Sequence, residues 1–319
     1  MPAPHLIERF AADLAAIWPE AARGQGGTIG LAVSGGPDSL ALLLLAHTAL
    51  PGRIAAATVD HGLRAESAAE AALVATVCAG LGVPHHTLSV CVAPGNLQSE
   101  ARTARYAALT NWVTEHGLTA LATAHHADDQ AETLMLRLNR ASGVAGLAGV
   151  RARGMAPGTR VPLLRPLLGW RRAELGAIVN TAGVQAVADP SNVNDRFDRA
   201  RMRKALAGAD WLDVEALAHS AAHLADADAA LEWAAAREWA ERVEPSPMGL
   251  TYHPQAPRAV ALRVLTRIVA ELDGEPPRGA AVARLFDTLV ARQPASIGGL
   301  VARALPDGWS FTKAPRRRT

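Results

Sequence analysis

The stretch LAVSGGPDSLALLLLAH, residues 31–47, places a polar turn between two apolar runs. The first run belongs to TIGLAV (28–33), which predicts a strand, and the second predicts a helix from about Ser39 to Ala49. Gly35 and Gly36 allow a tight turn and a close approach of the backbone to an anion. The start of the helix offers free N–H groups and the positive end of its dipole to the same point. The alternative is a structural turn in which Asp38 or Ser39 caps the helix.

Short apolar runs alternate with helical patterns through residues 28–126, which predicts an α/β fold with a parallel sheet covered by helices on both faces. Ligands of such sheets bind at the carboxyl ends of the strands. The predicted strands end at Ser34, at Asp60-His61 and at His125-His126, and all three ends are polar. The expected strands are 28–33, 54–59, 85–90 and 119–124, with helices at 39–49, 67–81 and 99–116.

The remaining chain predicts a second, smaller domain. A helical pattern runs from about 128 to 140, residues 144–168 look irregular, and a helix is expected from about 170 to 182. We place the domain boundary between residues 207 and 208 and expect 208–319 to be mainly helical, with a short β-like end. Its helices are predicted near 213–243, 257–272 and 278–292. Trp211, Trp233 and Trp239 are expected in the core rather than as platforms for stacking bases.

Composition indicates a folded protein that works in the cytoplasm and does not span a membrane. Half of the 319 residues are hydrophobic, 19% are charged, and the formal net charge is +2. The longest apolar run, 40–46, is too short for a bilayer, and the amino-terminal residues lack the pattern of a signal peptide. Cys78 and Cys91 have no metal-site spacing and are expected to be reduced thiols.

Positive charge is concentrated in one part of the chain. Residues 151–204 hold eleven Lys or Arg against four Asp or Glu, and nearly all of these cations are arginine. Guanidinium groups bind phosphate in a fork geometry, so this stretch is a candidate contact surface for nucleic acid.

A second polar constellation, HHADDQAETLMLRLNRASGVAGLAG, occupies residues 125–149. Asp129 and Glu132 are three residues apart on the expected helix, so their carboxylates share one face. Two carboxylates at a strand end could hold an ammonium group or a metal ion, or remove a proton. The alternative is a solvated acidic helix start that favours the helix dipole.

The turn SGGPDS resembles the pyrophosphate loop, SGGxDS, of the ATP pyrophosphatase superfamily, whose members cleave ATP between the α- and β-phosphates. The resemblance implies a Rossmann-like ATP-binding domain. Asp38 then needs Mg²⁺ beside it, because a carboxylate repels phosphate unless a cation bridges the two. The residues that the resemblance assigns to ATP are Ser34, Gly35, Gly36, Pro37, Asp38 and Ser39, with Asp38 also assigned to the metal.

The segment 125–149 is similar to the pattern HHxDDQxETxLxRLxRGSGxxGLxG of the tRNA(Ile)-lysidine synthetase family, with Ala141 in place of one glycine. Further similar motifs are VDHGLR (59–64), EARTARYAAL (100–109), RPLL (165–168) and DPSNVNDRFDRARMR (189–203), where Ala200 replaces an asparagine. The resemblance implies a short-form enzyme that uses ATP to adenylate the wobble cytidine of tRNA(Ile) with a CAU anticodon. The ε-amine of free L-lysine then replaces AMP at C2.

The resemblance also assigns roles to individual residues. Asp129 and Glu132 would grip the lysine, and His125 would assist proton transfer or orient the cytosine. Arg105 would hold the lysine carboxylate or a tRNA phosphate, and Arg203 completes the predicted catalytic set.

Five further residues have a functional and a structural alternative. Arg102 lies three residues before Arg105, and a solvated helix face explains it as well as a binding role does. Asp60 and His61, together with Arg64 in the same motif, could contact the nucleotide or form a turn. Arg199 shares the last motif with Arg203.

Rival interpretations remain open at this point. A 2-thiolating tRNA enzyme of the same superfamily would use cysteine pairs or an Fe–S cluster, and this chain has no CxxC motif. A small-molecule synthetase would not need the arginine-rich stretch, and a silent nucleotide sensor would not need Asp129 and Glu132. A homodimer is compatible with the sequence, which does not decide the oligomeric state.

We predict that affinity for tRNA falls steeply as salt rises from about 50 to 200 mM, because arginine–phosphate contacts release counterions. Filter binding across a salt series measures the slope. An affinity that is insensitive to salt would contradict the assignment of residues 151–204 to phosphate contacts.

Overall fold

The computed structural model describes residues 1–22, 26–62, 67–91, 97–187, 198–277 and 279–314. By its internal contacts the chain divides into two compact units, Met1–Ala225 and Asp226–Thr319, which are described separately below. The boundary at 207/208, which was predicted between a catalytic and an accessory domain, stays a prediction about function.

The first unit is built on a six-stranded sheet in the order β3-β2-β1-β4-β6-β5. All neighbouring strands are parallel except the edge pair β5 and β6. The predicted Rossmann-like α/β arrangement is therefore confirmed, with a mostly parallel sheet. The strands are β1 (Ile29–Ala32), β2 (Ile54–Asp60), β3 (His85–Ser89), β4 (Ala120–Ala122), β5 (Arg153–Met155) and β6 (Pro162–Leu164).

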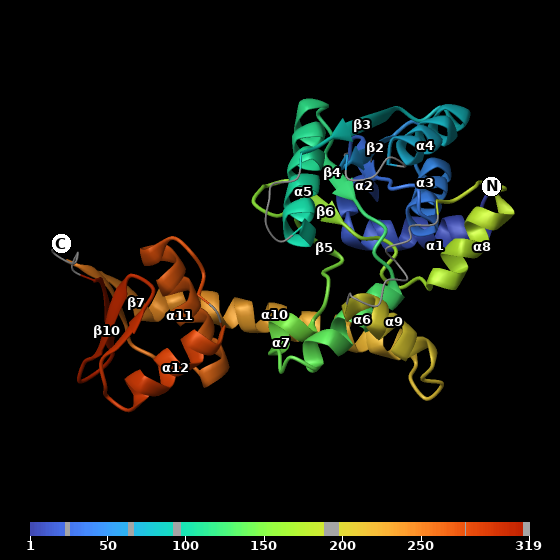
Figure 1. Ribbon diagram of the computed structural model, residues 1–319. Helices are drawn as coiled ribbons and strands as arrows, with labels where there is room; N and C mark the ends of the chain where they lie inside the picture. The colour runs from blue at the N-terminus through green and yellow to red at the C-terminus, as the bar shows by residue number, and fades with distance from the viewer. Residues whose placement is uncertain (23–25, 63–66, 92–96, 188–197, 278, 315–319) are drawn as a thin grey trace. The chain divides into compact units, whose positions relative to one another are not determined.

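Helices cover both faces of this sheet, and Figure 1 shows α5 on the side of the strands opposite α3 and α4. One core joins α1, α3 and α8 to the sheet around Phe10, Leu42 and Leu175. The other core packs α5 against the opposite face through Tyr106 and Trp112. The helices of the unit are α1 (Pro4–Ile17), α2 (Pro19–Ala22), α3 (Pro37–Ala49), α4 (Ser67–Leu81), α5 (Leu97–Glu115), α6 (Ala127–Leu138), α7 (Val144–Leu147), α8 (Arg172–Thr181) and α9 (Asp198–Ala207).

The strand order reverses at β1, which pairs with β2 on one side and with β4 on the other. In parallel α/β sheets this reversal leaves a crevice at the carboxyl ends of the two strands. The turn after β1 is the glycine turn 34–36, and the turn after β4 is His125-His126. The two motifs singled out in the sequence therefore meet at the edge where ligands bind.

The second unit contains a five-stranded antiparallel sheet in the order β7-β8-β11-β10-β9. The expectation of a mainly helical unit was incomplete, because the helices share the unit with this sheet. The β-like end that was predicted forms three of its strands, and the two strands at residues 243–252 were not predicted. The helix α10 (Val214–Arg242) ends within this unit. It is followed by β7 (Val243–Ser246), β8 (Gly249–Tyr252), α11 (Arg258–Asp273), α12 (Gly279–Val290), β9 (Ala295–Ile297), β10 (Leu300–Ala304) and β11 (Trp309–Lys313).

Two of the three tryptophans expected in the core are exposed. Trp211 and Trp233 are 78% and 64% exposed, and the guanidinium of Arg237 lies 5.2 Å from the centre of the Trp233 ring. Trp239 packs against the hydrophobic core of the second unit and also stacks with Arg267. The Ala-rich pattern of α10 did not distinguish a packed face from a solvated one.

The described helices include none with the length and apolar character needed to cross a membrane. Cys78 is buried and Cys91 is exposed, and both are free thiols.

The close packing of β1 against α5 predicts an opposite response to the same substitution at two glycines. A Cβ on Gly30 would lie 2.5 and 2.9 Å from Cζ3 and Cη2 of Trp112, whereas a Cβ on Gly80 in α4 meets no atom within 4 Å. We expect Gly30→Ala to lower the free energy of unfolding by about 1–3 kcal/mol through overpacking. Gly80→Ala should leave it unchanged or raise it by up to about 1 kcal/mol, because helical glycine is disfavoured. Urea denaturation measures both; equal effects would contradict the packing described here.

Candidate active site

The turn after β1 is held open by hydrogen bonds among its own residues. Ser39 Oγ accepts a hydrogen bond from the Ser34 N–H (3.1 Å) and donates one to the Gly36 carbonyl (2.9 Å). Gly35 has φ +84°, a conformation that side chains rarely allow, and its carbonyl accepts a hydrogen bond from Val187 N at 2.9 Å. The geometry explains why glycine occurs here.

The same turn fits an anion. Gly36 is the N-cap of α3 and makes no side-chain cap, and Pro37 begins the helix. The first-turn N–H groups of α3 therefore remain available to a ligand. A Cβ on Gly36 would meet only Ser34 Oγ, at 3.7 Å, so the backbone is open to close approach. These features agree with the phosphate-binding role predicted from the sequence.

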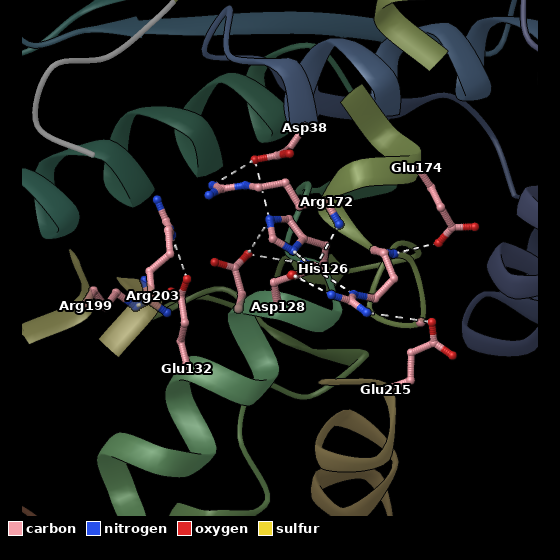
Figure 2. Close-up of polar contacts among 12 residues, drawn as sticks. Asp38, His126, Asp128, Glu132, Arg172, Glu174, Arg199, Arg203 and Glu215 are labelled. Atoms are coloured by element: carbon pink, nitrogen blue, oxygen red, sulfur yellow. Dashed lines mark hydrogen bonds and ion pairs between the residues drawn. The ribbon is translucent and has the colours of Figure 1, made fainter. Parts of the chain in front are cut away.

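His126 joins this turn to the carboxylate helix α6, and Figure 2 shows its ring between acidic side chains. Its Nε2 lies 3.4 Å from Asp38 Oδ2 and 3.6 Å from Asp129 Oδ2. Its Nδ1 lies 3.5 Å from Asp128 Oδ2, and the side chain is only 1% exposed. The ring therefore links a residue that follows β1 to two residues that follow β4.

The acidic neighbours determine the charge of this imidazole. Burial opposes protonation, but the hydrogen bonds and charges of Asp128, Asp38 and Asp129 outweigh it and raise the pKa of His126 to about 9. Burial likewise favours the neutral form of Asp38, but contacts with His126 and Arg172 lower the pKa of that carboxyl. At neutral pH His126 is thus an imidazolium between carboxylates.

The start of α8 is attached to the start of α6. The N–H of Arg172 donates to Asp128 Oδ2 at 2.8 Å, and Arg171 places its guanidinium 3.4 Å from Asp128 Oδ1. Burial opposes ionisation of Asp128, but His126, the Arg172 N–H and Arg171 together hold its pKa well below the usual range. The Arg172 side chain extends to the phosphate turn, where Nη2 lies 3.5 Å from Asp38 Oδ2.

Asp129 lies beside the ring of His126 and also closes the first turn of α6. Its Oδ2 accepts a hydrogen bond from the His126 N–H at 3.2 Å in a capping box. Asp38 Oδ1 is buried and has no hydrogen-bond partner among the described residues, which leaves one oxygen suited to a cation. Asp38 and Asp129 therefore converge on the space around His126, as the predicted lysine and metal roles require.

Glu132 is engaged by two arginines of α9. Its Oε1 accepts a hydrogen bond from Arg203 Nε at 2.8 Å, and Arg199 Nε lies 4.0 Å from Oε2. The Glu132 side chain is 2% exposed, so this charge is compensated inside the protein. The structure brings the predicted residues Glu132 and Arg203 together as a pair.

His125 lies on the other side of the carboxylates, near a cluster of cations. Its Nδ1 is 2.9 Å from Thr123 Oγ1. Burial lowers the pKa of His125. The negative charge of Asp129 raises this pKa, and the positive charges of Arg165 and Arg105 lower it further. The ring is neutral at pH 7, but a pKa lowered to about 3 makes it a weak proton acceptor.

Arginine side chains gather around Tyr106. The guanidinium carbons of Arg102 and Arg105 lie 5.0 and 5.3 Å from its ring centre. Arg165 is 8% exposed, and its Nε has no hydrogen-bond partner among the described residues. Burial lowers the pKa of both Arg105 and Arg165, although Tyr106 raises it. Such a group of cations favours an anionic ligand.

Asp60 is the last residue of β2 and His61 follows it, at the same edge of the sheet. Asp60 Oδ1 accepts a hydrogen bond from Gly62 N at 2.9 Å, so this residue shapes a turn. Burial and the charge of Arg105 lower the pKa of His61, whereas Asp60 raises it. Arg64 lies outside the described residues.

The predicted site residues thus fall into three contact groups, but four neighbours were not predicted from the sequence. The sequence placed His126 in a motif but predicted no separate role for it. The RPLL motif likewise predicted no role for Arg165. Arg171 and Arg172 had no signal beyond the density of arginine. Contacts between distant segments, which the sequence does not show, give these residues their places.

Comparison with known proteins identifies the family. Residues 7–209 match the family model of the PP-loop domain. A tRNA(Ile)-lysidine synthase from Novosphingobium aromaticivorans is 50% identical over 98% of this chain and 94% of its own length. The chain belongs to the tRNA(Ile)-lysidine synthase family. Another tRNA(Ile)-lysidine synthase, from Zymomonas mobilis, is 39% identical, with 92% of this chain and 90% of the relative covered.

A solved structure confirms the fold of the first unit. The U34-tRNA thiolase NcsA from Methanococcus maripaludis, with its [4Fe-4S] cluster, superposes with a TM-score of 0.57 and 15% identity. The match covers 68% of this chain and 77% of that chain. Membership of the tRNA(Ile)-lysidine synthase family therefore rests on sequence, and this structure supports the α/β architecture alone. A PP-loop domain implies that ATP is a substrate.

The position of His126 predicts a pH-dependent contribution to stability. A folded pKa of about 9, above the ordinary 6.5, gives stability that is complete below pH 6.5 and is lost as the pH rises through about 9. His126→Gln should remove a decline on the order of 3 kcal/mol between these pH values. Urea denaturation at pH 6.5 and 9 measures it. His5→Gln, at an exposed position of α1, should keep the wild-type slope, and an unchanged slope in His126→Gln would contradict the assignment.

Proposed function

We propose that this chain attaches L-lysine to C2 of the wobble cytidine in tRNA(Ile) with a CAU anticodon, using ATP. The observation that carries the proposal is the link made by His126, with Nε2 3.4 Å from Asp38 and 3.6 Å from Asp129. This link holds a phosphate turn and an acidic helix face at one site. Family membership supplies the substrates, and the geometry accommodates both halves of the reaction.

In the first step the cytidine C2 oxygen attacks the α-phosphorus of ATP, and pyrophosphate departs. The turn 34–39 would hold the phosphates through the N–H groups at the start of α3 and the hydroxyls of Ser34 and Ser39. Mg²⁺ at Asp38 would neutralise phosphate charge, and the buried, unpartnered Oδ1 of Asp38 is a suitable ligand. Asp60 and His61 would border the nucleotide.

In the second step the ε-amine of lysine attacks C2 and AMP leaves. An ammonium cannot attack, so one proton must first be removed. Asp129, which lies beside His126, would bind the ammonium, with Glu132 one turn further along α6. His125 is neutral and lies beside Thr123. Because its lowered pKa makes it a weak base, it would orient the cytosine rather than accept the proton.

The arginine group around Tyr106 would bind an anion of the substrates. Arg105 and Arg165 are both buried enough for their pKa to be lowered, and an anionic ligand would relieve that cost. Two ligands fit this chemistry: the carboxylate of lysine and a phosphate of the tRNA. Arg102 is closer to solvent at the edge of the group.

Binding of tRNA would use both proposed domains, a catalytic domain of residues 1–207 and an accessory domain of residues 208–319. The helix α9 exposes Arg199 and Arg201, whose side chains are 49% and 64% exposed. Arg199 lies 4.0 Å from Glu132, whereas Arg201 pairs with Asp198. Both could position phosphate near the site, while base contacts supply the choice of tRNA.

A 2-thiolating activity is the alternative within the same superfamily. An Fe–S cluster commonly uses four cysteine thiolates, and this sequence has two cysteines. Cys78 is buried, and burial raises the pKa of its thiol to about 11, which disfavours the reactive thiolate. Lysine ligation therefore fits the chain better.

The deciding assay incubates the protein with ATP, Mg²⁺, labelled lysine and a tRNA(Ile) transcript with a CAU anticodon. We expect label in the tRNA together with AMP and pyrophosphate in equal amounts. A transcript with uridine at the wobble position is the control and should take up no lysine. Release of pyrophosphate without lysine incorporation would contradict the proposal and favour a related enzyme.

Asp129→Asn should reduce lysine transfer about 10²- to 10⁴-fold, because it removes the charge that binds the ammonium. The amide oxygen can still accept the His126 N–H, so the melting temperature should change little. Glu215→Gln makes the same charge change at a residue whose side chain is 59% exposed, and it should keep full activity. Full lysine transfer by a folded Asp129→Asn variant would contradict the role of Asp129.

A further inference from the structure

Arg172 is a cation at the phosphate turn that no motif assigned to the reaction. It is the first residue of α8, and its own N–H donates to Asp128 Oδ2 at 2.8 Å. The preceding N–H, of Arg171, donates to Glu174 Oε2 at 2.7 Å. These two backbone contacts fix the point from which the Arg172 side chain projects.

Adjacent arginines take opposite directions from this point. The Arg171 guanidinium lies 3.4 Å from Asp128 Oδ1 and 3.9 Å from Glu215 Oε1. The Arg172 guanidinium turns to the phosphate turn, with Nη2 3.5 Å from Asp38 Oδ2. Figure 2 shows Arg172 beside Asp38 and Glu215 at the other end of the network. Only Arg172 of this pair therefore contacts the turn.

The phosphate turn itself lacks a positive side chain. Residues 34–39, SGGPDS, contain hydroxyls and a carboxylate but no lysine or arginine. A departing pyrophosphate carries several negative charges, which the start of α3 offsets only in part. A guanidinium can bind two phosphate oxygens at once, and its hydrogen bonds to phosphate are charge-assisted.

The contact between Arg172 and Asp38 is loose enough for Arg172 to leave Asp38 and bind phosphate instead. Its 3.5 Å separation is longer than a charge-assisted hydrogen bond, and the side chains are 35% and 21% exposed. Asp38 has a second oxygen, Oδ1, that is buried and without a hydrogen-bond partner among the described residues. A cation at Asp38 would therefore leave Arg172 available to the phosphates.

We propose that Arg172 binds the β- and γ-phosphates of ATP and holds the pyrophosphate as it leaves. The bond between the α-phosphorus and the bridging oxygen breaks, and its electron pair passes to the β-phosphate. The guanidinium lies where this charge develops, so it stabilises the leaving group. This inference rests on the proposed ATP-dependent function and adds to it the residue that handles the leaving group.

Direct binding of inorganic pyrophosphate tests the inference without turnover. Isothermal titration of the full chain with Mg²⁺ and pyrophosphate should give a Kd about 10- to 100-fold higher for Arg172→Met than for the wild type. The Kd for AMP should change less than about twofold, because AMP lacks the β- and γ-phosphates. Arg172→Lys should recover part of the pyrophosphate affinity.

Arg160→Met is the control, because it removes the same charge at an exposed residue that precedes β6 and lies outside the network around His126. It should bind pyrophosphate like the wild type, and melting curves confirm that each variant is folded. Unchanged pyrophosphate affinity in folded Arg172→Met, or an equal loss in Arg160→Met, would overturn the inference. An equal loss of AMP and pyrophosphate affinity would also overturn it.

The inference and the proposed function fail in different experiments. Pyrophosphate binding needs neither lysine nor tRNA. Loss of pyrophosphate affinity in Arg172→Met, with no lysine incorporation by the wild type, would support the role of Arg172 and contradict the choice of substrate. Lysine incorporation by the wild type, with undiminished pyrophosphate binding by Arg172→Met, would support the choice of substrate and contradict the role of Arg172.

Discussion

The charged contact of His126 with Asp38, Asp128 and Asp129 is the interaction on which the site depends. Three carboxylates around one buried point repel one another unless a cation lies between them. A protonated imidazole supplies that cation and has two N–H groups to direct at them. The phosphate turn and the acidic helix thereby take fixed positions before any substrate arrives, and preorganised charges are the effective kind in catalysis.

The sheet provides the frame for this contact. Pairing of β1 with β4 sets the two turns side by side, although the segments are far apart in the sequence. The start of α8 adds a third segment through Asp128, so residues from three parts of the chain hold one network. Such a network tolerates little displacement, because each member contacts at least one group of opposite charge.

Much of the first unit could be predicted because its local and global preferences agree. The helix 67–81 was predicted with the bounds that the structure has, and the glycine turn had a mechanical reason to be where it is. The strands β5 and β6 are three residues each within a Gly- and Pro-rich segment, so periodicity could not reveal them. In the second unit, β7 and β8 escaped prediction for the same reason. The directions of Arg171 and Arg172 depend on tertiary contacts, which no local pattern encodes.

The pair formed by Glu132 and Arg203 has a consequence for how the amino acid would enter. A guanidinium tethered to the protein already occupies the position of a counter-ion. An incoming ammonium would therefore compete with the Arg203 guanidinium for Glu132, because this carboxylate is already paired. Swapping one positive group for another keeps the local charge constant, so the exchange requires little electrostatic work. The enzyme would then select an amino acid by the length and shape of its side chain. It would bind free lysine more weakly than a site with an unpaired carboxylate would.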